Sequence, residues 1–242
     1  MDNFKVMHKK ASNLLKNAGI ALICAIAVSS VIFCSFKIRT IADDAGLSPR
    51  KTTVVIDAGH GGIDGGVSGI STGVKESFLN LEYSKCLYEI LSEAGFDVVL
   101  TRPTGAGLYG TTAKGFKKRD MKKRKEIIEK ANADVVVSVH MNYCEIRSRR
   151  SAQTFYKKGH AGSERLAFCV QGKINEMTET VKKTSPLVGD YYILNCTETP
   201  SVLVECGFLS NTEDERLLLT EEYRLTLCYA IYTGIVSFLA NK

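Results

Sequence analysis

Three apolar stretches of this chain each end in a side chain that can bind a metal or transfer a proton. The first, Thr52–Gly66 (TTVVIDAGHGGIDGG), enters a glycine-rich turn that carries His60. The second, Asp134–His140 (DVVVSVH), ends in a histidine, and the third, Ser201–Glu205 (SVLVE), ends in a glutamate. Short apolar, β-branched runs of this kind are typical of buried strands. Because sites in open α/β sheets form beyond the carboxyl ends of the strands, we expect the three side chains to meet in one crevice.

The positions of the histidines favour a metal site. His8 is in the N-terminal tail and His160 in a polar loop, whereas His60 and His140 both follow apolar strands, which packing alone does not explain. Glu76, in the expected first turn of the next helix, is placed to be a third ligand, although a carboxylate is also favoured at a helix N-terminus for electrostatic reasons. Two imidazoles and one carboxylate leave the fourth tetrahedral position open for water, which is the pattern of a catalytic zinc site.

Glu205 is the candidate general base of such a site. Zinc lowers the pKa of a bound water to about 7 and polarises a carbonyl, and a carboxylate beside that water can accept its proton. A buried, unpaired glutamate would be costly in a purely structural role. The glycine-rich turn has neither GxxxxGK[ST] nor a clean GxGxxG, so a nucleotide phosphate site is not favoured.

The elements that must position these residues alternate along the chain. Besides the three strands above, we expect strands at Phe96–Leu100, at Ala152–Tyr156 and near Tyr192–Leu194, and helices at Lys75–Ala94, Asp120–Asn132, Ser163–Thr180 and Glu221–Leu239. Ser163 is the expected N-cap of its helix. This alternation predicts an α/β fold with a mostly parallel central sheet covered by helices on both faces.

Composition and charge argue against several other kinds of site. The net charge of +6 does not demand a nucleic acid partner, and it allows weak attraction to an anionic surface such as a membrane or cell wall. The basic run is interpreted as a solvated helix face, with attraction to an anionic polymer or lipid surface as the alternative; it contains Lys122, Lys123, Arg124, Lys125 and Lys130. None of the eight cysteines forms a CxxC pair, which rules out a zinc ribbon and favours buried free thiols.

The N-terminal 51 residues have the pattern of a membrane anchor. Residues 1–16 are a basic tail, residues 17–36 carry no charge and are mostly apolar, and residues 37–51 are a polar linker before a catalytic domain at 52–242. At about 1.5 Å per residue the apolar run just spans a hydrocarbon core of about 30 Å. The preceding lysines predict a cytosolic N-terminus and an extracytoplasmic domain. A cleavable signal peptide, with a weak site at Thr40 and Ala42, is the alternative and would give a secreted protein.

With these motifs in this order, the chain resembles the zinc-dependent N-acetylmuramoyl-L-alanine amidases of the branch called Amidase 3. The matching segments span Lys51 to the C-terminus: VVIDAGHGGIDGG, VKESFLNL (Val74–Leu81), VVLTR (Val98–Arg102), ADVVVSVHMN (Ala133–Asn142) and PSVLVECGFLSN (Pro200–Asn211). The departures from the family pattern are Met141, where a short residue is usual, and Ala58 and Gly65. None of these is a candidate ligand.

The resemblance implies one zinc ion held by His60, Glu76 and His140, with Glu205 as the catalytic glutamate. The implied reaction is hydrolysis of the amide between N-acetylmuramic acid and L-alanine in peptidoglycan. Four further residues, Met141, Asn142, Gly207 and Phe208, are expected to border the substrate groove.

The sequence indicates the biological role less specifically than it indicates the reaction. MKKRKEIIEK and SAQTFY (Ser151–Tyr156) look most like the sporulation subgroup, whose members trim spore cortex peptidoglycan. A vegetative role in cell separation or wall turnover is one alternative. A zinc peptidase of similar fold and a non-catalytic, metal-containing wall-binding module are two others. We expect targeting by the anchor, by the basic surface or by a partner protein.

Overall fold

The computed structural model describes residues 50–178 and 183–240. The basic tail, the anchor or signal peptide and nearly all of the linker predicted at the N-terminus lie outside the described residues. The same holds for Cys24 and Cys34, whereas the six cysteines within the described ranges are free thiols, as expected from the sequence.

A six-stranded sheet with the order β2-β1-β3-β6-β4-β5 forms the centre of the domain. Four neighbouring strands run parallel: β2 (Asp97–Leu100), β1 (Thr53–Ala58), β3 (Val135–Asn142) and β6 (Ser201–Phe208). The strand β4 (Gln153–Tyr156) is antiparallel to β6, and the short β5 (Leu187–Val188) pairs with β4 in parallel. The predicted α/β fold with a mostly parallel sheet is therefore confirmed.

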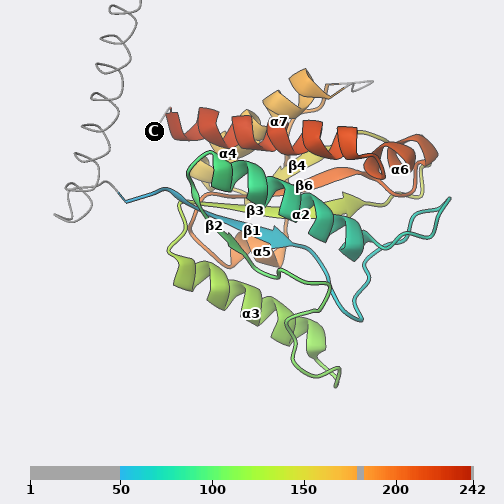
Figure 1. Cartoon of the computed structure of the whole chain (residues 1–242), viewed down its shortest axis with the longest axis horizontal. Helices are drawn as coiled ribbons and strands as arrows, with labels where there is room; N and C mark the ends of the chain where they lie inside the picture. Colours follow the sequence, from blue (N-terminus) through green and yellow to red (C-terminus); the bar gives the residue numbers. More distant parts are fainter. Residues whose placement is uncertain (1–49, 179–182, 241–242) are drawn as a thin grey trace, which may run out of the picture. The chain divides into compact units, whose positions relative to one another are not determined.

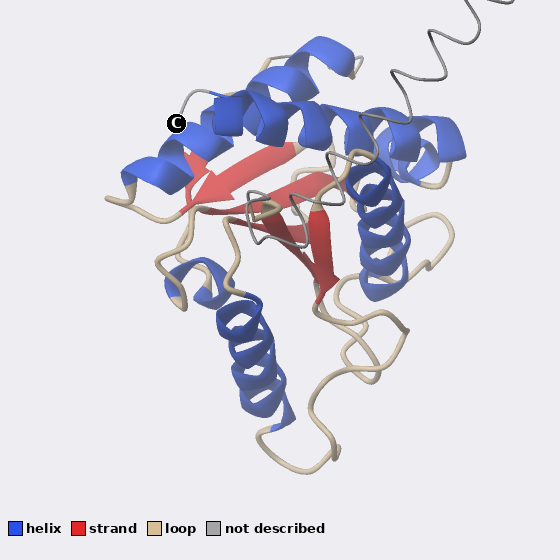
Figure 2. Ribbon diagram, turned by 60° about the vertical axis from the view of Figure 1, so that its left-hand side comes forward, coloured by secondary structure: helices blue, strands red, loops and turns tan. Residues whose placement is uncertain are grey.

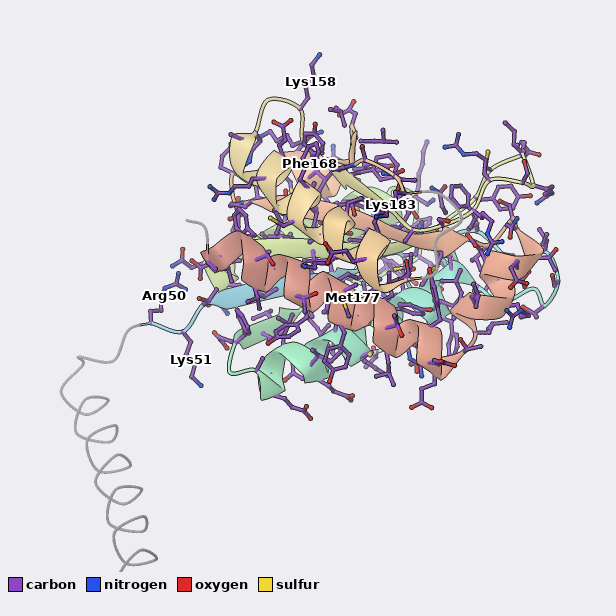
Figure 3. The ribbon with its side chains drawn as sticks, turned by 90° about the horizontal axis from the view of Figure 1, so that it is seen from above. Arg50, Lys51, Lys158, Phe168, Met177 and Lys183 are labelled. Carbon is purple, nitrogen blue, oxygen red and sulfur yellow. The ribbon has the colours of Figure 1, made fainter. Side chains whose placement is uncertain are left out.

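Helices cover both faces of the sheet (Figure 1, Figure 2). One face carries α2 (Glu76–Glu93), α4 (Ala161–Met177) and α7 (Glu221–Ala240), and the other carries α3 (Phe116–Ala131) and the single-turn α5 (Tyr192–Asn195). The helix α6 (Thr212–Leu218) follows β6 and leads into α7. Seen from above (Figure 3), Phe168 and Met177 lie along α4 with exposed side chains, so α4 forms part of the outer surface on that side.

The apolar runs of the sequence become strands that are buried on both faces. Every residue of β1 is buried, which explains why its apolar residues Val54, Val55 and Ile56 are consecutive rather than alternating with exposed polar ones. The larger core lies under α2, α4 and α7, and the smaller core on the other face consists of Val55, Ile128, Val136, Ile193, Leu194 and Leu203. By length and mean hydropathy, 1.2, α7 could cross a membrane, but 39 % of this stretch is buried, with Leu227, Ile231 and Phe238 in the larger core.

The predicted start of α4 is wrong. The helix begins at Ala161, and His160 rather than Ser163 is its N-cap, because Nδ1 of His160 accepts a hydrogen bond from the backbone N–H of Ser163 at 3.0 Å. The hydroxyl oxygen of Ser163 instead accepts a hydrogen bond from the backbone N–H of Ser201. His160 therefore has a structural role in the polar loop where the sequence places it.

Three further expectations need correction. The strand expected near Tyr192–Leu194 is the helix α5, whose turn is closed by hydrogen bonds from the N–H groups of Leu194 and Asn195 to the carbonyl oxygen of Tyr191. The basic helix α3 begins four residues earlier than predicted, directly after Gly115 with a φ of +85°. The interpretation of its basic run as a solvated face is wrong for Arg124, which is buried. The helix α6 was not predicted.

Candidate active site

Three potential metal ligands meet at the carboxyl edge of the parallel strands. His60 follows β1, His140 lies near the end of β3, and Glu76 is the first residue of α2. Oε1 of Glu76 lies 3.2 Å from Nε2 of His60 and 2.9 Å from Nδ1 of His140. The ligand atoms of the three residues all lie within 4.8 Å of one another, so this cluster can hold one metal ion.

The glycine-rich turn is needed for this close approach. A Cβ atom on Gly59 would overlap the imidazole of His140, and a Cβ atom on Gly66 would overlap the carboxylate of Glu76. His60 itself has a φ of +59°, in the left-handed region that glycine favours. The turn therefore allows the backbone to pass directly beside two ligands while it presents the third.

Glu76 is buried and held as an anion. Burial alone would raise its pKa, but the contacts with His140 and His60 bring the pKa well below its usual range. Asn80 donates a hydrogen bond to Oε1 at 3.1 Å, and the backbone N–H of Val67 donates one to Oε2 at 3.0 Å. An anionic carboxylate between two imidazoles fits a ligand better than it fits a residue that only complements a helix N-terminus.

A second carboxylate, Asp64, lies behind His60. Its Oδ2 is 3.1 Å from Nδ1 of His60 and 3.6 Å from Nζ of Lys117 in α3. A carboxylate at this ring nitrogen orients the imidazole so that Nε2 faces Glu76 and His140, as is common behind metal-binding histidines. The sequence reasoning did not single out Asp64, although its position four residues after His60 was a usable signal.

Glu205 of β6 lies beside the cluster and outside the ligand set. It is opposite His140 in the register of β3 and β6, and it is 8 % exposed. Within the part of the chain that the structure describes, its Oε2 has no hydrogen-bond partner. Burial raises the pKa of Glu205 to about 7, with His140 opposing this rise and Glu76 adding to it. A buried carboxylate with a free oxygen and a near-neutral pKa is suited to general-base catalysis.

A cavity of about 250 Å³ lies next to His60 and His140. The loop before α3 and the start of α3 contribute Tyr109 and Phe116, and α5 and the residue before it contribute Tyr191, Tyr192 and Ile193. The rings of Tyr109 and Phe116 contact each other edge to face at 5.4 Å. Apolar, aromatic walls with a few polar groups are typical of small-molecule sites, so this cavity is the candidate substrate site. Sequence reasoning missed all of these residues.

The predicted groove residues lie elsewhere. Met141 and Phe208 are 2 % and 5 % exposed, and Gly207 is also buried, because β3 and β6 are central strands covered on both faces. None of the three lines the cavity next to His60 and His140, and the expectation that they border the substrate groove stays a prediction. Asn142 is half-buried, and its Oδ1 accepts a hydrogen bond from the N–H of Tyr143 at 2.7 Å.

Comparison with known proteins identifies the family of the chain. The family described as N-acetylmuramoyl-L-alanine amidase, Amidase 3, matches residues 54–237. The germination-specific N-acetylmuramoyl-L-alanine amidase of Bacillus subtilis is 31 % identical over 193 residues, which cover 78 % of this chain and 80 % of that protein.

Solved structures show the same relationship. The CwlD amidase from Clostridioides difficile, determined in complex with the GerS lipoprotein, is 36 % identical with a TM-score of 0.76 over 80 % of this chain and 100 % of that chain. The catalytic domain of the amidase CwlV from Bacillus (Paenibacillus) polymyxa is 29 % identical with a TM-score of 0.69 over 79 % of this chain and 99 % of that chain. The chain therefore belongs to the Amidase 3 family and is an N-acetylmuramoyl-L-alanine amidase, whose peptidoglycan substrate lies outside the cytoplasm.

Proposed function

We propose that this amidase uses one zinc ion held by His60, Glu76 and His140, with Glu205 as the general base. The observation that supports the proposal is the convergence of three donor groups beside a buried carboxylate. Two imidazoles and one carboxylate fit a catalytic zinc site, since they leave one tetrahedral position open. When bound there, zinc supplies Lewis acidity toward the scissile carbonyl and toward water.

Residues of the chain transfer the protons and bind the substrate. Glu205 accepts a proton from the attacking water, and the bond between the lactyl carbonyl carbon and the nitrogen of L-alanine breaks. Glu205 returns the proton to the departing amine, so the products are a muramic acid carboxylate and a stem peptide with a free N-terminus. The cavity walls, Tyr109, Phe116 and Tyr191 among them, hold the groups next to the scissile bond, and Asn142 borders the approach to it.

We further propose that residues 17–36 anchor the enzyme to the cell membrane, with residues 1–16 in the cytosol, residues 37–51 as a linker and residues 52–242 as the extracytoplasmic catalytic domain. The supporting observations are the lysines before a charge-free apolar run and the extracytoplasmic location of peptidoglycan. Cleavage of this segment as a signal peptide would instead release the enzyme.

We assign the enzyme to the modification of spore cortex peptidoglycan. Support comes from the relative in Bacillus subtilis that is named germination-specific and from the similarity to the CwlD amidase. That the CwlD amidase was determined in complex with a lipoprotein also supports a protein partner for this chain.

Digestion of purified peptidoglycan tests both the chemistry and the role. The full chain in mild detergent is incubated with cortex and with vegetative peptidoglycan, and mass spectrometry identifies the new ends. We expect stem peptides with a free N-terminal L-alanine, more from cortex than from vegetative material. A chelator should abolish their release, and added zinc should restore it.

The other outcomes would each contradict a different part of the proposal. Cleavage within the stem peptide would indicate a peptidase. Zinc binding without release of any product would indicate a wall-binding module, and faster digestion of vegetative material would reject the cortex role. Activity that survives complete removal of the metal would reject the zinc site.

A further inference from the structure

Two buried arginines contact the backbone of the turn that carries His60. Arg102 follows β2 and Arg124 lies in α3, and each is 1 % exposed. The helix α3 lies on the sheet face opposite α2 (Figure 1). Although the two arginines come from separate elements, both guanidinium groups bind the same three-residue segment, Ala58–His60.

Arg124 binds the first and last carbonyl groups of this segment. It donates one hydrogen bond to the carbonyl oxygen of Ala58 and one to that of His60, each at 2.6 Å. Its remaining contacts are ion pairs with Asp57 and Asp120, also at 2.6 Å. The guanidinium therefore bridges the end of β1, the turn and its own helix.

Arg102 binds the middle of the segment and connects it to α2. Its Nε donates to the carbonyl oxygen of Ala58 at 2.9 Å, and its Nη2 donates to those of Gly59 and Ser77 at 2.8 Å each. Ser77 directly follows Glu76, so one side chain holds two of the segments that supply ligands. Burial, together with the positive charge of Arg124, lowers the pKa of Arg102 to about 10, which leaves it protonated at neutral pH.

The backbone of the turn needs this support. A residue other than glycine in the left-handed region persists only where surrounding groups hold it there, and His60 has a φ of +59°. Arg124 donates one of its hydrogen bonds to the carbonyl oxygen of His60 itself. Asp57 and Asp120 both form ion pairs with Arg124 and so offset its positive charge, whereas Arg102 donates to carbonyl oxygens.

We propose that Arg102 and Arg124 are positioning residues of the metal site: they hold the turn in the form that aims His60 at Glu76 and His140, and they thereby set the affinity for zinc. The inference rests on the zinc site proposed above. This positioning role requires guanidinium groups, since only a planar fork of five donors can bind several carbonyl oxygens and carboxylates at once. The three donors of a lysine ammonium radiate from a single atom and cannot span the same acceptors.

The first test is Arg124→Lys, with Lys123→Met as the matched control from the exposed face of the same helix. The full chain is purified in mild detergent, stripped of metal and titrated with zinc against a chelating dye. We expect the zinc dissociation constant to rise about 10- to 100-fold in Arg124→Lys, the usual effect of losing a group behind a metal ligand, and to stay unchanged in Lys123→Met. At saturating zinc, Arg124→Lys should regain most of the turnover that it loses at low zinc.

The second test separates positioning from folding. Arg124→Gly leaves a space that guanidinium ion can enter, and we expect millimolar guanidinium to restore zinc affinity while ammonium does not. Recovery of the melting temperature without recovery of zinc affinity would overturn the proposal. So would failure of this variant to fold under any of these conditions, because Arg124 would then serve folding alone.

The zinc titrations also distinguish the two proposals. If the unaltered protein fails to bind zinc, the proposed function is wrong. If it binds zinc and a folded Arg124→Lys binds with the same affinity, the zinc site stands and only the positioning role is refuted.

Discussion

Replacing Glu205 by glutamine should stabilise the metal-free protein at alkaline pH while it removes most of the activity. Both effects follow from a carboxylate that is buried at the end of β6 with an oxygen that lacks a partner among the described residues. Glutamine keeps the shape of the side chain but can neither carry the charge nor accept the proton of water.

The size of the stability effect follows from the pKa. Burial raises the pKa of Glu205 from 4.5 to about 7. At about 1.4 kcal/mol for each pH unit, this rise corresponds to about 3 kcal/mol. Between these two pH values the native state binds more protons than the unfolded state, so its stability falls as the pH rises. The glutamine variant has no such loss. The two proteins should therefore be about equally stable at pH 4 and differ by about 3 kcal/mol at pH 8, with the variant more stable.

Urea denaturation of both metal-free proteins at pH 4 and pH 8 measures this difference. Glu89→Gln, an exposed change on α2, is the control and should have no effect at either pH. With zinc present, Glu205→Gln should keep its full zinc content, and turnover should fall about 10²- to 10⁴-fold, the usual effect of losing a general base. Equal stability of the two proteins at pH 8 would refute the buried-charge argument. Loss of zinc from Glu205→Gln would indicate that Glu205 is a metal ligand, and unchanged turnover would refute its role as a base.

Three other predictions concern the remaining histidines, two glycines and the topology. Alanine at His60 or His140 should remove zinc, measured by elemental analysis, and activity together. His160→Ala should retain its zinc but lose about 1 kcal/mol of stability, because it removes the N-cap of α4. Gly59→Ala should lower the zinc content because the added Cβ overlaps the ring of His140. Gly172→Ala in α4 is the control, since its added Cβ meets no atom within 4 Å. Denaturation should show that this control is neutral or more stable by up to about 1 kcal/mol. Cell fractionation should recover the full-length chain with the membrane, and a shortened soluble form would instead indicate a cleaved signal peptide.

The sheet and the candidate metal-binding cluster were predictable because both follow from local pattern. Continuous apolar runs identified β1, β3 and β6, and parallel strands place their carboxyl ends at one edge. That rule predicts from the sequence alone that His60, His140 and Glu205 lie together. Glu76 was also predictable, since the turn after β1 returns the chain to the same edge where α2 begins.

Features that depend on tertiary contacts were missed or misread. Arg124 lies in a run of lysines, and the basic composition of this run gave no reason to expect that Arg124 alone is buried. A period of four residues was nevertheless present, because Asp120, Arg124 and Ile128 are the buried residues of α3. The aromatic cavity was hidden for a similar reason. Tyr109 and Tyr191 are 82 positions apart in sequence, and only the packing of α3 and α5 on the same sheet face brings them to one cavity.

The contacts of the His60 turn connect the proposed zinc site to both helical layers. From one face, Asn80 of α2 binds both the carboxylate of Glu76 and the carbonyl oxygen of Gly59. From the other face, Arg124 of α3 binds the carbonyl oxygen of His60. Since α2 and α3 touch the sheet on opposite sides, the geometry of the ligands depends on how each helix packs, and a substitution in either layer can change zinc affinity without touching a ligand.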